Sequence, residues 1–137
     1  MRFVKISNVE LIKIRKLYEG LMSYACYGLF FREGLAIGEE FVNTVIDSGE
    51  EYFKAVKNVL EHRGWAKEVT FKNEKIFVKE SAEAEPGCKS PTCHILRGIL
   101  QKVMEEHYGK KIRCTEEKCR SVEGDKCVFK YEVAIKE

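Results

Sequence analysis

Three cysteines and one glutamate in the C-terminal third constrain the fold of this chain more than any other feature. They are Cys93, Glu116, Cys119 and Cys127, with the spacing C-x22-E-x2-C-x7-C. Thiolates together with one carboxylate make a four-ligand set that suits zinc. A metal bound by all four residues would join the start of a helix at Cys93 to a hairpin that carries the other three.

Side-chain alternation in that hairpin places the donors on its inner face. Cys127 lies two residues before Phe129 on the apolar face of the last strand, and Glu116 shares the inward face of the preceding strand with Cys114. An inward carboxylate is unfavourable unless it is paired or binds a cation. We therefore expect Glu116 to bind a metal, the alternative being an ion pair with a lysine such as Lys118.

The remaining thiols leave several alternatives open. Six cysteines are compatible with a disulfide framework, and Cys88 and Cys93 have the spacing for one bridge. Clustered thiols in a reducing compartment are more typical of metal sites, and free cysteines also pack as small buried apolar groups. Cys88 and Cys114 compete with the four expected ligands. His94 borders Cys93, but on a helix it points about 100° away from it.

Composition is that of a globular protein without an obvious polyanionic or lipid partner. Of the 137 residues, 45% are hydrophobic and 34% are charged, and the formal net charge is only +2. This balance gives no reason to expect direct binding to nucleic acid or to a membrane. No apolar run approaches the roughly 20 residues that span a bilayer, and the N-terminus lacks a signal-peptide pattern. We expect one cytoplasmic domain covering residues 1–137.

Periodicity and turn residues predict an α+β fold. Helical patterns cover about residues 8–31, 36–46, 49–62 and 91–108, with a break expected at Arg32–Gly34. Ser90 and Pro91 are a typical N-cap and first residue of the last helix. Strands are expected at about 66–72, 75–80, 110–116 and 126–135. The predicted architecture is a helical layer packed on a four-stranded, mostly antiparallel sheet, with a zinc site joining a helix to the C-terminal hairpin.

A composite motif between Cys93 and Phe129 resembles a known family. It combines Cys93-His at a helix start, Glu116-Glu-Lys-Cys119 at a strand end, and Gly124-Asp-Lys-Cys127-Val-Phe129. This combination is similar to that of the 4-vinyl-reductase-like domain family, which also occurs in phenol-responsive transcription activators. The resemblance implies a zinc-stapled α/β domain, usually dimeric, in which three cysteines and a glutamate hold the zinc. Carried over, the ligands are the four residues named above.

The resemblance also implies a pocket for a small apolar or aromatic molecule. The first half of the chain is rich in aromatic residues, and three of them combine a ring with a polar tip: Tyr24, Tyr27 and Trp65. We expect these three to line a ligand pocket between the helices and the sheet. The alternative is that the rings simply fill the core.

These observations together predict a zinc-stabilised small-molecule sensor domain without catalysis of its own. We expect a homodimer that passes its signal to a separate effector protein. The alternatives are an enzyme or accessory subunit acting on a tetrapyrrole-like or aromatic substrate, and an assembly module, because related folds occur in vesicle-tethering complexes. The chain contains no G-x-S-x-G, P-loop, G-x-G-x-x-G or H-E-x-x-H motif.

Overall fold

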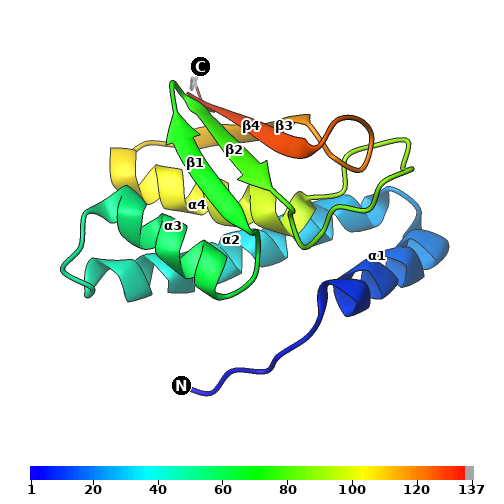
Figure 1. The fold of residues 1–137 in the computed structure, drawn as a ribbon, viewed down its shortest axis with the longest axis horizontal. Helices are drawn as coiled ribbons and strands as arrows, with labels where there is room; N and C mark the ends of the chain where they lie inside the picture. Colours follow the sequence, from blue (N-terminus) through cyan, green and yellow to red (C-terminus); the bar gives the residue numbers. More distant parts are fainter. Residues whose placement is uncertain (135–137) are drawn as a thin grey trace.

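The computed structural model describes residues 1–134 and has the α+β architecture expected from the sequence (Figure 1). Within these residues the elements follow in the order α1 (Asn8–Met22), α2 (Ala25–Ile46), α3 (Tyr52–His62), β1 (Glu68–Lys72), β2 (Lys75–Lys79), α4 (His94–Tyr108), β3 (Ile112–Lys118) and β4 (Lys126–Val133). The last strand was expected to reach Ile135, which lies outside the described residues.

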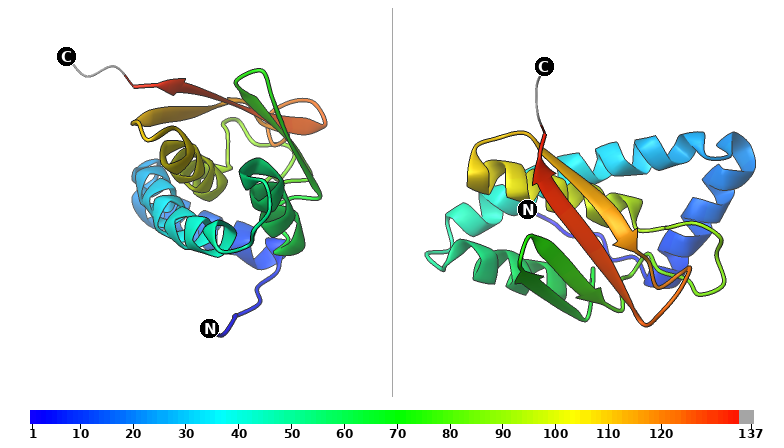
Figure 2. Two further views of the ribbon diagram at one scale, coloured as in Figure 1. Left: turned by 90° about the vertical axis from the view of Figure 1, so that its left-hand side faces the viewer. Right: turned by 90° about the horizontal axis from the view of Figure 1, so that it is seen from above.

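The four strands form one antiparallel sheet in the order β1-β2-β4-β3. Helices α3 and α4 cover one face of the sheet, and α2 lies against α4 on the side away from the strands (Figure 2). The register places Phe129 opposite Ile76 on one side and opposite Glu116 on the other. The carboxylate of Glu116 therefore lies on the sheet face that the helices cover.

Helix α4 supplies the centre of the core. Five of its apolar side chains are fully buried or nearly so, and they pack against inward residues of the sheet: Leu96, Ile99, Leu100, Val103 and Met104 from the helix, and Ile76, Val78 and Phe129 from the strands. Apolar residues recur every three or four positions along α4, which gives the helix one continuous apolar face. This face fixes α4 on the sheet and brings its first residue, His94, close to the β3–β4 hairpin.

The long first helix expected from the sequence is in fact two helices. The chain turns at Ser23, which has a φ of 54°, and its backbone N–H bonds the Glu19 carbonyl. The break expected at Arg32–Gly34 was wrong, because α2 runs through all three residues. Gly34 instead lies where α2 crosses α4, and a Cβ there would overlap the backbone of Ile95. The glycine serves close helix packing and does not end the helix.

Helix α1 projects from one end of the molecule and has only one buried residue, Arg15 (Figure 1). One side of α1 carries apolar residues that lie largely exposed: Ile14, Leu17, Tyr18, Leu21 and Met22. We call these five residues the α1 apolar face. Among the described residues, no helix combines the length and apolar character needed to cross a membrane.

Candidate metal centre

Four donor residues meet where the start of α4 approaches the β3–β4 hairpin. Cys93, Glu116, Cys119 and Cys127 each offer one ligand atom, and these atoms all lie within 4.8 Å of one another. The three cysteines are buried and the glutamate is half-buried. The structure thus brings together the complete set that spacing and alternation predict.

Local backbone structure holds each donor in place. Cys93 is the N-cap residue of α4, and its backbone N–H donates to Glu116 Oε1 at 3.2 Å. A register shift between Glu116 and Lys118 ends the regular pairing of β3 just before Cys119. Cys127 lies at the start of β4, where its Sγ accepts from the backbone N–H of Arg120 at 3.4 Å. The sulfurs of Cys93 and Cys127 are 3.7 Å apart.

The four donor groups differ in how readily they lose a proton, because their pKa values are shifted in different directions. Hydrogen bonds from Cys127 and Cys93 hold the pKa of the Cys119 thiol far below its usual range, because they stabilise its thiolate. The same hydrogen bond to Cys119, with a further one to Cys127, raises the pKa of Cys93. Burial, together with the charge on Cys119, raises the pKa of Glu116 to about 8. A divalent cation would allow all four groups to ionise together.

The donor set fits a metal on two further observations. Glu116 Oε2 is buried and has no hydrogen-bond partner, and no described lysine forms the ion pair that was the alternative to metal binding. All six cysteines are free, so the alternative disulfide between Cys88 and Cys93 is absent. Cys88 and Cys114 lie outside the four-residue group. Three thiolates and one carboxylate form a closed set of the kind that holds structural zinc.

A buried glutamate that sequence reasoning missed caps α4 beside the cluster. Both carboxylate oxygens of Glu83 accept backbone N–H groups, from Ile95 at 3.0 Å and from Leu96 at 2.7 Å. Burial raises the pKa of Glu83 to about 7. The helix therefore begins at His94, three residues later than the expected start at Pro91, because its cap comes from the loop after β2. No local spacing in the sequence marks this long-range contact.

The expected ligand-binding residues lie apart. A cavity of about 240 Å³ beside the metal centre is lined by Tyr27, Ser90, Pro91, His94, Arg97, Thr115 and Glu116. The ring of Tyr27 stacks on His94 with 4.1 Å between centroids. Tyr24 is 74% exposed, and Trp65 packs at the edge of the core after α3. The lining of the cavity includes neither residue, so only Tyr27 of the expected three contributes to it.

His94, like Glu116, brings to this cavity a polar atom that lacks a hydrogen-bond partner. Its Nε2 atom is buried without a hydrogen-bond partner. Burial lowers the pKa of His94 to about 4, so the ring is neutral. Arg97 lies over the Phe31 ring at 4.0 Å, and its Nη1 donates to the Cys114 carbonyl. In the sequence, His94 was marked only by its adjacency to Cys93.

The fold and the site together define a class of protein. It is an α+β domain in which three cysteines and one glutamate cluster between a helix and a hairpin. Residues 74–133 of this chain match the V4R domain, which confirms the resemblance to the 4-vinyl-reductase-like family in that part of the chain. Among the curated proteins, none matches the sequence.

Two solved structures share the fold. The phenol-responsive sensory domain of the transcription activator PoxR, solved with phenol, is 18% identical with a TM-score of 0.79, covering 97% of this chain and 77% of that chain. A vinyl-4-reductase family protein from Methanocaldococcus jannaschii is 17% identical with a TM-score of 0.63, covering 98% of this chain and 99% of that chain. At these identities the likeness establishes a common fold.

Proposed function

We propose that this chain is a small-molecule sensor domain stabilised by zinc. The observation that carries the proposal is the cluster of four buried donors, set in a fold shared with a phenol-responsive sensory domain over 97% of the chain. The cluster supports a structural metal, and the shared fold supports ligand sensing. Residues 1–137 then act as one domain, because the cluster ties α4 to the hairpin that closes the sheet.

Zinc bound by Cys93, Glu116, Cys119 and Cys127 would supply cross-linking and charge neutralisation. With four protein ligands the coordination set is closed, which is typical of a structural site and leaves no position for a substrate. The chain's own residues then hold the ligands in place: the Cys93 backbone N–H orients Glu116, and the Arg120 backbone N–H orients Cys127. Catalysis is not part of this proposal.

The cavity beside the metal centre is the ligand site that we propose. Nε2 of the neutral His94 ring is buried without a hydrogen-bond partner, and it accepts a hydrogen bond when the other nitrogen carries the proton. A small aromatic molecule with a hydroxyl group would donate to it, while the rings of Tyr27 and Pro91 cover the apolar surface of the ligand. Tyr24, whose ring lies 5.7 Å from that of Tyr27, is placed to contact a larger ligand.

Calorimetric titration of the zinc-loaded protein with phenol tests the ligand site. We expect 1:1 binding that is weakened at least about tenfold in His94→Phe, since loss of one hydrogen bond to a buried partner costs roughly 1–3 kcal/mol. Trp65→Phe serves as the matched control, because Trp65 is not part of the cavity lining. Absence of binding by phenol and by a panel of substituted phenols would contradict the sensor proposal.

An assembly role is the second candidate, and the α1 apolar face favours it. An exposed row of large apolar side chains on one helix is unusual for a monomer and is typical of an interaction surface. We propose that two copies pair through this face, so that a sensor domain and a dimer are compatible. A separate effector would then read the state of the dimer.

A further inference from the structure

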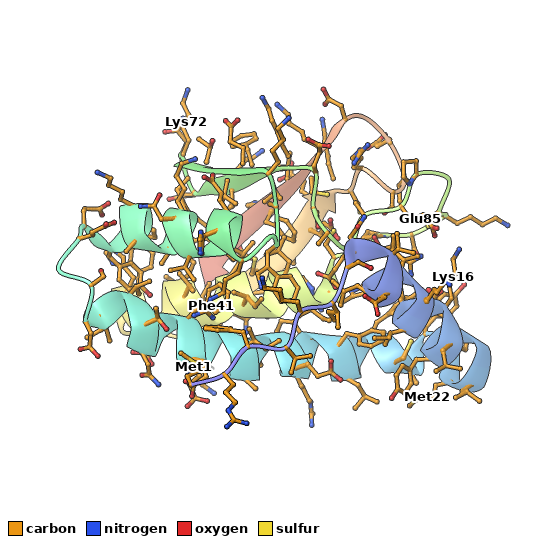
Figure 3. The ribbon with its side chains drawn as sticks, turned by 60° about the horizontal axis from the view of Figure 1, so that its bottom comes forward. Met1, Lys16, Met22, Phe41, Lys72 and Glu85 are labelled. Atoms are coloured by element: carbon orange, nitrogen blue, oxygen red, sulfur yellow. The ribbon has the colours of Figure 1, made fainter. Side chains whose placement is uncertain are left out.

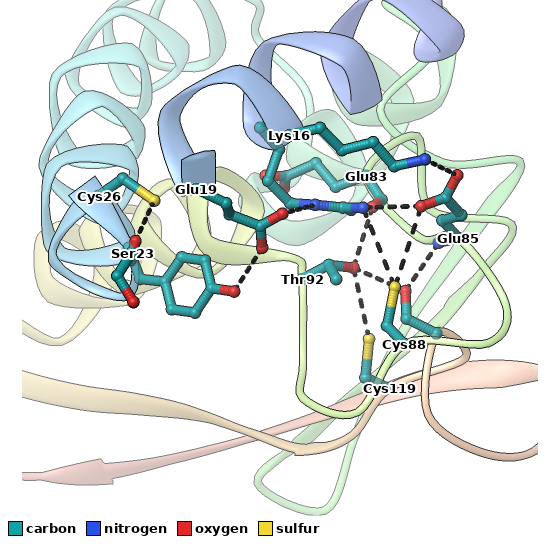
Figure 4. A network of polar contacts seen from close by, with 12 residues as sticks. Lys16, Glu19, Ser23, Cys26, Glu83, Glu85, Cys88, Thr92 and Cys119 are labelled. Atoms are coloured by element: carbon teal, nitrogen blue, oxygen red, sulfur yellow. Dashed lines mark hydrogen bonds and ion pairs between the residues drawn. The ribbon is translucent and has the colours of Figure 1, made fainter. Parts of the chain in front are cut away.

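The only buried residue of α1 is a charged one, and outside its own helix its polar contacts go to a single loop. The side chain of Arg15 is 7% exposed, and its Nη1 donates to the Glu83 carbonyl at 3.3 Å. Its Nη2 donates to Glu85 Oε1 at 2.8 Å and lies 3.9 Å from Cys88 Sγ. Arg15 thus attaches α1 to the loop that runs from the end of β2 to the start of α4. Figure 4 shows Glu83, Glu85 and Cys88 of this loop beside α1.

The same loop is bonded to the segment that follows Cys119. Thr92 Oγ1 donates to the Glu83 carbonyl at 2.9 Å and lies 2.6 Å from Ser121 Oγ. Ser121 Oγ in turn accepts the backbone N–H of Glu85 at 2.7 Å. Thr92 and Ser121 are both buried. The loop is therefore held between Arg15 on one side and the segment after β3 on the other.

Two hydroxyl groups extend this network to the sulfurs of the metal cluster. Ser81 Oγ lies 3.1 Å from Cys93 Sγ, and Thr92 Oγ1 lies 3.8 Å from Cys119 Sγ (Figure 4 shows Thr92 and Cys119). The path from α1 to a metal ligand is thus short. It runs from the Arg15 guanidinium through the Glu83 carbonyl and the Thr92 hydroxyl to Cys119.

Helix α1 has few other attachments to the body of the protein, and one of them is the edge-on contact of Tyr18 with the Phe30 ring of α2. Its apolar face is largely exposed, with Leu21 at 72%. Lys16 pairs with Glu85 at 3.1 Å, but its side chain is 58% exposed, so this surface pair adds little (Figure 3). Glu19 accepts a hydrogen bond from Tyr27 of α2. Arg15 is therefore the buried side chain through which α1 is attached to the loop.

We propose that Arg15 is a positioning residue that couples the docking of α1 to occupation of the metal centre. This inference rests on the proposed function, because it requires a metal at the four donors. Metal binding would fix the positions of Cys93 and Cys119. Because Ser81 and Thr92 contact these sulfurs, the loop that Arg15 contacts would become more ordered. Coupling free energy is reciprocal, so a docked α1 must in turn retain the metal more tightly.

The consequence is a link between metal occupancy and the α1 apolar face. When the loop loosens, Arg15 loses its acceptors on Glu83 and Glu85 together and keeps only the Glu19 carboxylate of its own helix, at 3.6 Å. A buried guanidinium that loses most of its partners is unfavourable. The helix then leaves the body of the protein and carries its exposed apolar residues with it. Loss of metal would thereby alter the surface that a second copy or an effector contacts.

The test is the rate at which a chelator removes zinc from the full chain. After zinc content is confirmed in the wild type, release is followed with a colorimetric chelator in Arg15→Gln and Arg15→Lys. We expect Arg15→Gln to speed release at least about fivefold, within the usual range of coupling between sites. Arg15→Lys keeps the positive charge but loses the planar guanidinium that donates to two acceptors. Its rate of zinc release should therefore fall between those of the wild type and Arg15→Gln.

Two controls separate coupling from general loss of stability. Lys16→Gln removes the exposed neighbour that also pairs with Glu85, and it should leave the release rate unchanged. Val56→Ala creates a cavity in the core on α3, and it should lower the melting temperature without changing release. Release from Arg15→Gln at the wild-type rate overturns the inference, as does an equal acceleration in Val56→Ala. Should Arg15→Gln not fold, Glu85→Ala removes one acceptor of Arg15 and must also accelerate release.

Hydrogen exchange provides an independent readout. Chelation of the wild type should lower amide protection in α1 more than in α3, and Arg15→Gln should do so even with zinc bound. Equal protection of α1 with and without metal overturns the inference. A wild-type protein that holds no zinc contradicts the proposed function itself, which distinguishes the two failures.

Discussion

Gly34 of α2 and Gly98 of α4 face one another where the two helices cross. A Cβ at Gly98 would overlap the Phe31 carbonyl, and one at Gly34 would overlap the Ile95 carbonyl. The backbones are therefore in direct contact, which brings α2 close beneath α4 and holds the start of α4 near the hairpin. This crossing determines where Cys93 and His94 can lie.

Gly98→Ala should destabilise the protein by about 3 kcal/mol or more, because overpacking at a contact between two backbones forces the helices apart. Urea unfolding measures the change. Gly28→Ala is the matched control: Gly28 lies in α2 with open space around the position of a Cβ, and alanine there should stabilise by about 0.5–1 kcal/mol. A Gly98→Ala variant as stable as the wild type would show that the helices do not touch here.

Removal of zinc should lower the melting temperature by at least about 10 °C. A structural metal binds the folded state alone, and for a domain of this size each kcal/mol lost shifts the midpoint by roughly 3–5 °C. Differential scanning calorimetry with and without a chelator measures the shift. An unchanged midpoint after complete zinc removal would contradict a structural role.

Glu83 should make the metal-free protein more sensitive to rising pH than a variant that lacks the carboxyl. Its pKa is about 7 in the folded protein against 4.5 in the unfolded chain. Between these values the folded state keeps a proton that the unfolded state has released, so stability falls as pH rises. Relative to Glu83→Gln, the wild type should lose up to about 3 kcal/mol between pH 4.5 and pH 8.

Comparison with the variant isolates this effect. His94, whose pKa is lowered to about 4, acts in the opposite direction below pH 6.5, but its contribution is common to both proteins and cancels. Urea titrations of the two chelated proteins at several pH values give the difference. If the wild type instead became more stable relative to Glu83→Gln as pH rises, Glu83 would be ionised in the folded state at all these pH values.

Leu21→Lys should convert the proposed dimer to a monomer. Leu21 is 72% exposed in the single chain, so a charge there costs little in the monomer but would be buried between two copies. Light scattering coupled to size-exclusion chromatography measures the mass. Lys13→Glu on the same helix controls for charge, because Lys13 is not part of the α1 apolar face. A wild-type protein that is monomeric at all concentrations would contradict the dimer proposal.

The sheet, α4 and the four donors were predictable because their signals are local. Alternation of apolar and polar residues places Cys127 and Glu116 on the inner face, and the spacing of the cysteines brings them to one edge. The register confirms this arrangement, with Glu116 opposite Phe129. The identity of the metal stays a prediction.

Other features depend on contacts between distant segments and could not be predicted. Gly34 suggested a helix end because a glycine needed for a helix crossing looks the same in sequence as a helix breaker. Ser90 and Pro91 indicated a helix start, but Glu83 caps α4 at a later residue. The role of Arg15 follows only from a loop 68 residues away in sequence.

The metal content of the purified protein tests the central claim most directly. Mass spectrometry under native conditions, with elemental analysis, should find about one zinc per chain in the wild type and in Cys114→Ser, whose thiol lies outside the cluster. Cys119→Ser should lose most of that zinc. Less than about half a zinc per wild-type chain, or full zinc retention in Cys119→Ser, would contradict the assignment of the metal centre.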